Sequence, residues 1–175
     1  MPVELAPGVY WVGAIDWTIR DFHGYSTEDG STYNAYLIVD DKITLVDTVK
    51  EGFVSEMLSR ISEIVDPEKI AYIVSNHVEM DHSGSMTEVV ERVKPEKIFC
   101  SPQGKAGLMR HFKKDFPFVE VKTGSELSLG RYNLAFLETP MLHWPDSMMT
   151  YLKEEQILFS SDGFGAHYAS SARFD

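Results

Sequence analysis

The sequence predicts an α/β fold with a mixed β-sheet, most simply two sheets with helices on the outside. Two observations support this prediction. Short apolar runs separated by Gly, Pro and Asp recur along the chain, and helical stretches lie between several of those in its middle. The final part changes character and returns to strands joined by short polar links, an order typical of layered α/β folds. A length of 175 residues corresponds to one domain with room for a hydrophobic core.

The strands are predicted from short runs rich in β-branched and aromatic residues. The first run covers residues 8–14, and the runs at 34–39 and 42–47 have the spacing of a two-residue hairpin. The run at 71–76 is almost continuously apolar, which suits a strand buried on both faces. Further strands are expected over residues 97–101, 119–123, 131–139, 150–153 and 156–160.

Three helices are predicted between these strands. In the first, over residues 52–65, Phe53, Met57 and Ile61 recur at four-residue spacing, so that one face of the helix covers a sheet. The second helix is expected over residues 85–93. The third is expected over residues 102–112 and begins with a proline, whose missing N–H costs nothing at the first helical position.

Composition and charge exclude several classes of partner. Acidic residues outnumber basic residues by 27 to 16, and the formal net charge is −11. Such a chain repels phosphate backbones and anionic lipid, so we expect neither a nucleic acid nor a membrane as partner. The single cysteine, Cys100, excludes an internal disulfide, a Cys-rich zinc site and a Cys-ligated iron–sulfur cluster within these residues. We find no signal peptide and no apolar run near the ~20 residues of a membrane span, and expect a cytoplasmic protein.

Residues with metal-binding side chains are concentrated just after the predicted strand at 71–76. The segment reads S-N-H-V-E-M-D-H-S-G and contains His77, Glu79, Asp81 and His82. In extended backbone, residues two apart share a face, so the first three of these can point to one side. A bend at residues 80–83 would let the last two face a second position. Imidazoles and carboxylates at this spacing are typical metal ligands, and the alternative is a polar surface loop.

Two further candidates occupy equivalent places after later strands. His143 lies in M-L-H-W-P-D after the strand at 131–139, and Asp162 lies in S-S-D-G after the strand at 156–160. Sites in α/β folds gather at the carboxyl ends of strands. Taken alone, His143 also fits a packed, hydrogen-bonded histidine and Asp162 an Asp-Gly turn. Together with the first motif, they would complete a site for two metal ions.

These motifs resemble the metallo-β-lactamase-like domain of the flavodiiron proteins. The similarity lies in H-x-E-x-D-H, in H-W-P-D-S and in S-D-G-F-G, and it extends to residues 13–17, 20–25, 32–36 and 47–50. It covers essentially the whole chain. This family, also called the A-type flavoproteins, includes rubredoxin:oxygen oxidoreductases. The resemblance implies the αββα sandwich of the metallo-β-lactamase superfamily, with mixed sheets and present only in part.

The resemblance also implies a role for each candidate ligand. The first iron would be held by His77, Glu79 and His143, and the second by Asp81. Asp162 would bridge the two irons. These assignments follow from the family pattern.

The roles of two histidines vary more within this pattern. His82 would ligate the second iron in some members of the family. His23, in D-F-H-G-Y, would lie in the second sphere near the substrate pocket, and a surface-loop histidine is the alternative.

Glu79 separates this sequence from the hydrolytic relatives of the same fold. Zinc hydrolases resemble H-x-H-x-D-H, with a histidine where this chain has Glu79. A carboxylate adds negative charge and a harder oxygen donor, which favours iron over zinc. The main alternative is therefore a zinc-dependent hydrolase, in which a metal-bound hydroxide attacks the substrate.

The expected function follows from the resemblance. Residues 1–175 would form a diiron domain that is incomplete at its C-terminal end, because the family takes one more histidine ligand from a later part of the domain. We find no flavodoxin-type phosphate loop, so FMN would bind to a domain outside this chain. The parent protein would reduce dioxygen to water, nitric oxide to nitrous oxide, or both, with electrons relayed through FMN from a rubredoxin-type donor. A head-to-tail homodimer is expected for the full-length protein, and an inactive metal-free fragment is a further alternative.

Overall fold

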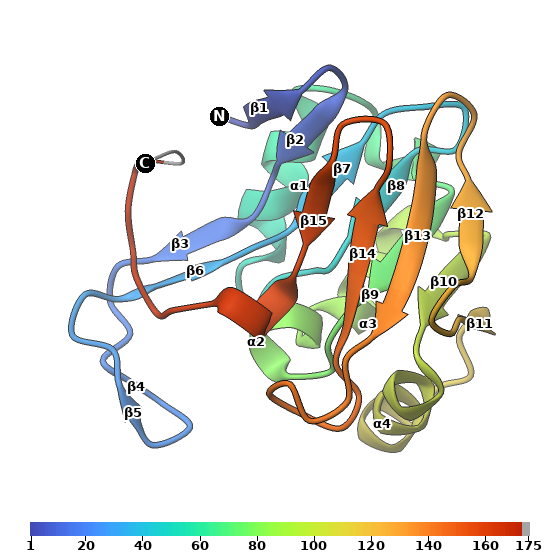
Figure 1. Cartoon of the computed structure of the whole chain (residues 1–175). Helices are drawn as coiled ribbons and strands as arrows, with labels where there is room; N and C mark the ends of the chain where they lie inside the picture. Colours follow the sequence, from blue (N-terminus) through green and yellow to red (C-terminus); the bar gives the residue numbers. More distant parts are fainter. Residues whose placement is uncertain (173–175) are drawn as a thin grey trace.

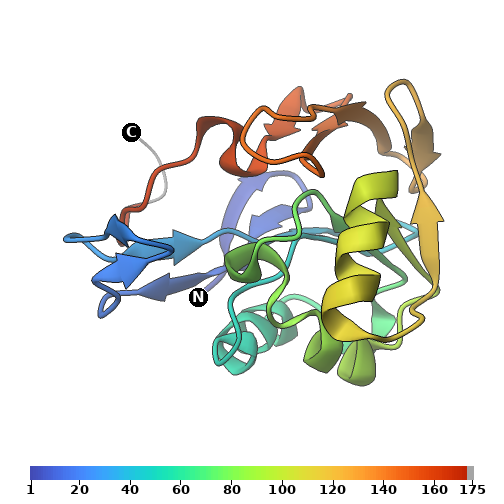
Figure 2. The same ribbon diagram turned by 90° about the horizontal axis from the view of Figure 1, so that it is seen from below.

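The computed structural model describes residues 1–172, which form a layer of helices, a seven-stranded sheet and a four-stranded sheet (Figures 1 and 2). The two sheets lie face to face. Helices α1 and α3 cover the face of the seven-stranded sheet that points away from the smaller sheet (Figure 2). The predicted arrangement of two sheets with helices outside is therefore confirmed.

The seven-stranded sheet is mixed, as predicted. Strands β7 and β8 pair antiparallel as a hairpin, but five residues connect them in place of the two expected, with Ile38 opposite Thr44. Strands β8, β9, β10 and β11 run parallel to one another. Helices connect the parallel strands, as such pairings require. In spatial order the strands are β1 (Val3–Ala6), β2 (Val9–Trp11), β7 (Tyr36–Ile38), β8 (Thr44–Val46), β9 (Tyr72–Ser75), β10 (Lys97–Cys100) and β11 (Phe118–Glu120).

The four-stranded sheet is antiparallel throughout and comes from the second half of the chain. Two short ribbons extend sideways from the layers (Figure 1). One ribbon pairs β3 with β6, and the other pairs β4 with β5. The sheet consists of β12 (Glu126–Ser128), β13 (Asn133–Glu138), β14 (Met148–Leu152) and β15 (Ile157–Phe159), and the ribbons of β3 (Ala14–Asp16), β4 (Asp21–Phe22), β5 (Tyr25–Ser26) and β6 (Ser31–Tyr33).

Local signals account for the helix positions. The last helix, α4, has the predicted bounds, and the side chain of Ser101 caps it by accepting a hydrogen bond from Gly104 N at 2.9 Å. Helix α1 is shorter than expected at both ends. Among residues 1–172, none of the helices has the length and hydropathy of a membrane span. The helices are α1 (Val54–Ser62), α2 (Met80–Ser83), α3 (Met86–Val93) and α4 (Pro102–Phe112), with short 3₁₀ helices η1 (Pro67–Lys69) and η2 (Ser161–Phe164).

The central strands separate two hydrophobic cores. On β9, Ile73 faces α1 and α3, whereas Tyr72 and Val74 face the smaller sheet. The alternation explains the almost continuous apolar run, because both faces of this strand are buried. The smaller sheet contributes Leu134 and Phe136 of β13 to the inner core. This packing holds the ends of both sheets at a constant separation.

One predicted strand is wrong and several short ones were missed. Residues 8–14 form two strands, β2 and β3, separated at Val12 and Gly13. At Gly13 a Cβ atom would lie 2.0 Å from the carbonyl oxygen of Tyr33, so the chain passes another segment too closely for a side chain. The missed strands, β1, β4, β5, β6 and β12, have two to four residues each and become strands only through their partners.

Candidate metal centre

The candidate ligands come from four segments that meet at one end of the two sheets, the lower end in Figure 1. His77 lies two residues after β9, and Asp81 and His82 belong to α2. His143 lies in the loop between β13 and β14. Asp162 lies in η2, directly after β15. The six residues that the sequence indicated are therefore brought into one region.

The first group combines two imidazoles with two carboxylates. The ligand atoms of His77, Glu79, His143 and Asp162 all lie within 4.8 Å of one another. Glu79 Oε2 lies 3.2 Å from His77 Nε2 and 3.1 Å from His143 Nε2. Asp162 Oδ2 lies 3.3 Å from His143 Nε2. Nitrogen and oxygen atoms that converge in this way fit a divalent transition metal.

The second group consists of Asp81, His82 and Asp162, again within 4.8 Å. His82 Nε2 lies 2.8 Å from Asp162 Oδ1 and 3.6 Å from Asp81 Oδ2. Asp162 thus directs one carboxylate oxygen to each group, as a bridging ligand does. Asp81 lies in the helical turn of α2, at the place where the sequence predicted a bend over residues 80–83 that turns Asp81 and His82 toward a second position.

Buried negative charge indicates that this region suits a cation. Burial raises the pKa of Asp81, and the nearby carboxylates of Asp162 and Glu79 raise it further against the opposing effect of His82. Asp81 Oδ1 is buried and has no hydrogen-bond partner in the described part of the chain. Such an oxygen is costly unless a proton or a metal ion satisfies it. The donor set and this orphaned oxygen both fit a metal ion in the second group.

Hydrogen bonds from the two residues that follow β8 fix the loop that carries the first motif. Asp47 accepts hydrogen bonds from Asn76 N at 2.7 Å and from Asn76 Nδ2 at 3.0 Å. Thr48 donates from its backbone N and from Oγ1 to the carbonyl oxygen of His82, at 2.9 and 2.8 Å. The end of β8 therefore holds both ends of the segment from His77 to His82.

Three residues around the centre adopt a left-handed backbone conformation that favours glycine. The φ angles are 57° at Asp47, 92° at His143 and 48° at Ser161. The value at His143 is far from the usual range of a side-chain-bearing residue. Strained backbone of this kind concentrates at functional sites, where the surrounding structure enforces it.

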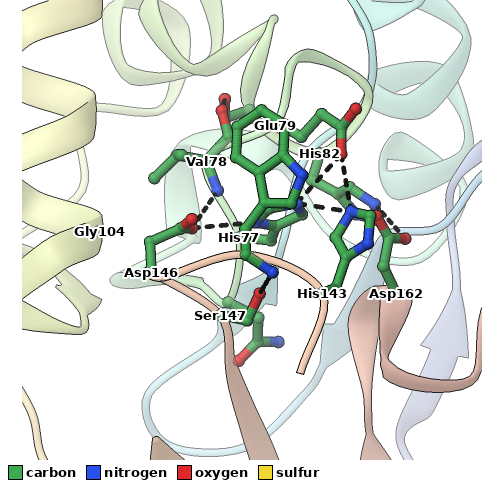
Figure 3. A network of polar contacts seen from close by, with 12 residues as sticks. His77, Val78, Glu79, His82, Gly104, His143, Asp146, Ser147 and Asp162 are labelled. Atoms are coloured by element: carbon green, nitrogen blue, oxygen red, sulfur yellow. Dashed lines mark hydrogen bonds and ion pairs between the residues drawn. The ribbon is translucent and has the colours of Figure 1, made fainter. Parts of the chain in front are cut away.

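Asp146 is a site residue that the sequence analysis did not single out. Its Oδ2 accepts hydrogen bonds from His77 Nδ1 at 2.9 Å and from Val78 N at 2.8 Å. Figure 3 shows His77 between Asp146 on one side and Glu79 and His143 on the other. The available signal was its place three residues after His143 in H-W-P-D.

The other histidines lie outside both groups. His23 is at the tip of the β4–β5 ribbon, with its Nε2 3.4 Å from Glu79 Oε1, and its side chain is half exposed. His167 Nδ1 lies 3.1 Å from Ser31 Oγ. His111 stacks edge-on against Phe112, its neighbour in α4.

Two cavities adjoin the centre on different sides. One, of about 400 Å³, is lined by residues that include Asp81, His82 and Asp162. The other, of about 390 Å³, is lined by residues that include His23 and Trp144. Both ligand groups can therefore be reached by a small molecule.

A fold of two facing sheets with two adjoining His/carboxylate groups at their ends defines a metal-binding domain of the metallo-β-lactamase-like class. The family model described as "ODP family beta lactamase" matches residues 32–174, and the chain belongs to this family. The fold class implied by the sequence motifs is confirmed.

Similar proteins confirm the resemblance to flavodiiron proteins. The nitric oxide reductase of Moorella thermoacetica is 50% identical over 177 residues, which cover 99% of this chain and 44% of that protein. The rubredoxin oxygen:oxidoreductase structure from Desulfovibrio gigas superposes with a TM-score of 0.96 at 47% identity, over 99% of this chain and 44% of that one. The flavodiiron protein of Giardia intestinalis has a TM-score of 0.95 at 42% identity, over 99% and 43%. The chain thus spans less than half the length of these proteins.

Proposed function

We propose that this chain is the diiron domain of an oxidoreductase that reduces dioxygen to water, nitric oxide to nitrous oxide, or both. The observation that carries the proposal is the pair of ligand groups joined by Asp162. The names of the similar proteins, a nitric oxide reductase and a rubredoxin oxygen:oxidoreductase, support the choice of substrates.

Each metal has a proposed set of ligands in this chain. The first iron is held by His77, Glu79 and His143, and the second by Asp81 and His82. Asp162 bridges them. The two sets differ in their nitrogen ligands, since the first has two imidazoles and one unshared carboxylate, and the second has one imidazole and one unshared carboxylate. Two iron ions, when bound, supply the electrons for reduction and a pair of Lewis acids at neighbouring positions.

The protein residues position the metals and shape their surroundings. Trp144 lies edge-on against the ring of His77, at 5.2 Å between centroids, and shields it from solvent. His23 Nε2 lies 3.4 Å from Glu79 Oε1, and we propose for His23 a second-sphere role at the substrate pocket. Selectivity between oxygen and nitric oxide would then depend on side chains of this kind.

The proposed partners belong to the longer protein. FMN would be held by a part of the protein outside this chain and would supply electrons to the irons, and a rubredoxin-type protein would be the electron donor. A head-to-tail homodimer would place the flavin of one subunit close to the irons of the other. We propose that the protein works in the cytoplasm.

Metal content measured together with gas consumption tests this proposal. The full chain is produced and purified without oxygen in medium that contains both iron and zinc, and its metals are measured by elemental analysis. We expect close to two irons per chain, and consumption of nitric oxide or dioxygen when the reduced protein is mixed with either gas. Zinc in place of iron, together with ester or phosphodiester hydrolysis, would contradict the proposal, and so would a folded chain that binds no metal.

A further inference from the structure

We infer that Asp146 is a positioning residue. Its carboxylate connects the loop that carries His143 to the loop that carries His77, and it orients His77 so that Nε2 faces the first metal. The inference rests on the proposed function only for the existence of a metal in the first ligand group. It does not depend on which gas is reduced.

The contact between Asp146 and His77 determines which nitrogen of the ring faces the metal. Oδ2 of Asp146 lies 2.9 Å from His77 Nδ1, and a carboxylate can only accept. The ring hydrogen must therefore lie on Nδ1, which leaves the lone pair of Nε2 directed toward Glu79 and Asp162. A carboxylate behind a metal-binding histidine also raises the basicity of the ligating nitrogen.

The same carboxylate oxygen holds the backbone of the first motif. Val78 N donates to it at 2.8 Å, so ring and main chain are attached to one atom. Asp146 and His77 are both buried, and within residues 1–172 Asp146 forms no ion pair with a lysine or arginine. The hydrogen bonds of the Asp146 carboxylate among the described residues therefore go to the His77 segment.

The main chain of Asp146 makes a separate contact with the start of α4. Its carbonyl oxygen accepts a hydrogen bond from Ser101 Oγ at 2.7 Å, and this contact does not involve the carboxylate on His77. His143, three residues before Asp146, has a φ of 92° and needs a loop that is held firmly. The Asp146 carboxylate ties this loop to His77 and Val78, so the distance between the rings of His77 and His143, 5.1 Å between centroids, depends on that carboxylate.

Ser101 provides a matched control, because it contacts the same residue without reaching the ligands. Ser101→Ala removes the bond to the Asp146 main chain and the cap of α4, and so destabilises the fold. It leaves the carboxylate on His77 untouched. If the role of Asp146 were purely structural, Asp146→Ala and Ser101→Ala would have the same effect on metal affinity.

The variants Asp146→Ala, Asp146→Asn and Ser101→Ala are compared by titrating the full chain with Co²⁺ against a competing chelator. We expect Asp146→Ala to weaken binding of the first Co²⁺ by roughly 10–100-fold, the range typical of lost second-sphere partners. Asp146→Asn retains an acceptor oxygen without the charge, and we expect a smaller but measurable loss. Ser101→Ala should bind Co²⁺ like the unmodified chain. The titrations are repeated in an Asp81→Ala background, which removes a ligand of the second group only. Losses of Co²⁺ affinity that persist there belong to the first group.

Proton NMR of the Co²⁺-loaded chain gives a second readout. The hydrogen on His77 Nδ1 should appear as a hyperfine-shifted exchangeable signal, because it is buried and bonded to Asp146. We expect the signal to persist in Ser101→Ala and to be lost by exchange with water in Asp146→Ala. A persistent signal in Asp146→Ala would overturn the inference.

The other outcomes separate this inference from the proposed function. Equal Co²⁺ affinity in Asp146→Ala and Ser101→Ala would overturn the inference alone. If Asp146→Ala does not fold, an unchanged affinity of Asp146→Asn for the first Co²⁺ would overturn the inference. A further outcome is that the variants show the expected losses of Co²⁺ affinity while the iron-loaded, unmodified protein consumes neither gas. That result would support the inference and contradict the proposed function. A folded, unmodified chain that binds no Co²⁺ would overturn both.

Discussion

Asp162 is the residue on which the proposed centre depends most, because it belongs to both ligand groups. Its Oδ1 lies near His82 and its Oδ2 near His143. The histidines around it hold the pKa of this carboxyl well below its usual range although burial opposes them. A residue in this position should affect both metals, whereas each of the other ligands should affect one.

Asp162→Asn is therefore expected to weaken metal binding at both ligand groups. An amide offers one oxygen in place of two, so the bridge is lost. In an anaerobic Fe²⁺ titration, we expect the affinity of each ligand group for Fe²⁺ to fall by more than the 10–100-fold typical of second-sphere changes. Asp81→Asn is the matched control and should weaken metal binding at the second group only. Retention of one tightly bound iron in Asp162→Asn would contradict the bridging role.

Glu79→His tests whether the carboxylate determines the choice of metal. The substitution turns two imidazoles and two carboxylates into three imidazoles and one carboxylate, a softer set that favours zinc. We expect a higher ratio of zinc to iron by elemental analysis of protein made in medium containing both. Glu79→Asp keeps a carboxylate and should keep the preference for iron. An unchanged ratio in Glu79→His would show that Glu79 does not select the metal.

At the scale of elements, the β3–β6 ribbon is held by one buried carboxylate. Asp16 accepts hydrogen bonds from Tyr33 Oη at 2.8 Å, from Thr18 N and Oγ1 at 3.0 and 2.9 Å, and from Ile19 N at 3.1 Å. Burial alone would raise the pKa of Asp16, but these donors outweigh it and hold the pKa below its ordinary value of 3.8. The ionised form is therefore the one that stabilises the ribbon.

Asp16→Asn should consequently destabilise the protein in a pH-dependent way. A pKa lowered by folding contributes stability above the unfolded value, near pH 4, that is lost as the pH falls through the lower folded value. At pH 7 we expect a loss of about 1–3 kcal/mol in the free energy of unfolding, because charge-assisted hydrogen bonds are lost. The difference from the unmodified chain should shrink below pH 4. Urea unfolding at several pH values measures it, and exposed Asp21→Asn is the control. A difference independent of pH would contradict this account.

At the scale of the whole molecule, the core between the two sheets sets the position of the site. Leu134 of β13 is fully buried in this core, whereas Leu137 on the same strand is 46% exposed. Packing in this layer determines how far the loop that carries His143 lies from the end of β9. The metal centre is therefore built by the contact between the sheets.

Leu134→Ala is expected to lower the free energy of unfolding by about 2–5 kcal/mol, because it leaves a cavity between the sheets. Leu137→Ala is the matched control on the same strand and should change it by less than about 1 kcal/mol. Urea denaturation followed by circular dichroism measures both. Similar losses in the two variants would contradict the assignment of Leu134 to the core.

Elements whose signals are local could be predicted from the sequence. Helix α4 was predicted with its observed bounds from a segment that begins with a proline, a start signal that lies within the helix itself. The two- and three-residue ribbon strands could not be predicted, because so short a segment is extended only while its partner holds it. The turn at residues 80–83 could be predicted as a bend but not as a helix, because four residues are too few to show a helical period.

The sequence by itself determined which residue types are available to a metal, because H-x-E-x-D-H is a local pattern of imidazoles and carboxylates. The family pattern implied how they are grouped, and only the tertiary structure shows the contacts that bring them together. His143 and Asp162 meet the first motif across 64 and 80 residues, and Asp146 meets His77 across 69. Periodicity and capping act over one or two turns of chain, whereas these distances depend on how two sheets pack face to face. The two-sided position of Asp162 was implied by the family pattern, whereas the contact of Asp146 with His77 emerges only in the folded chain.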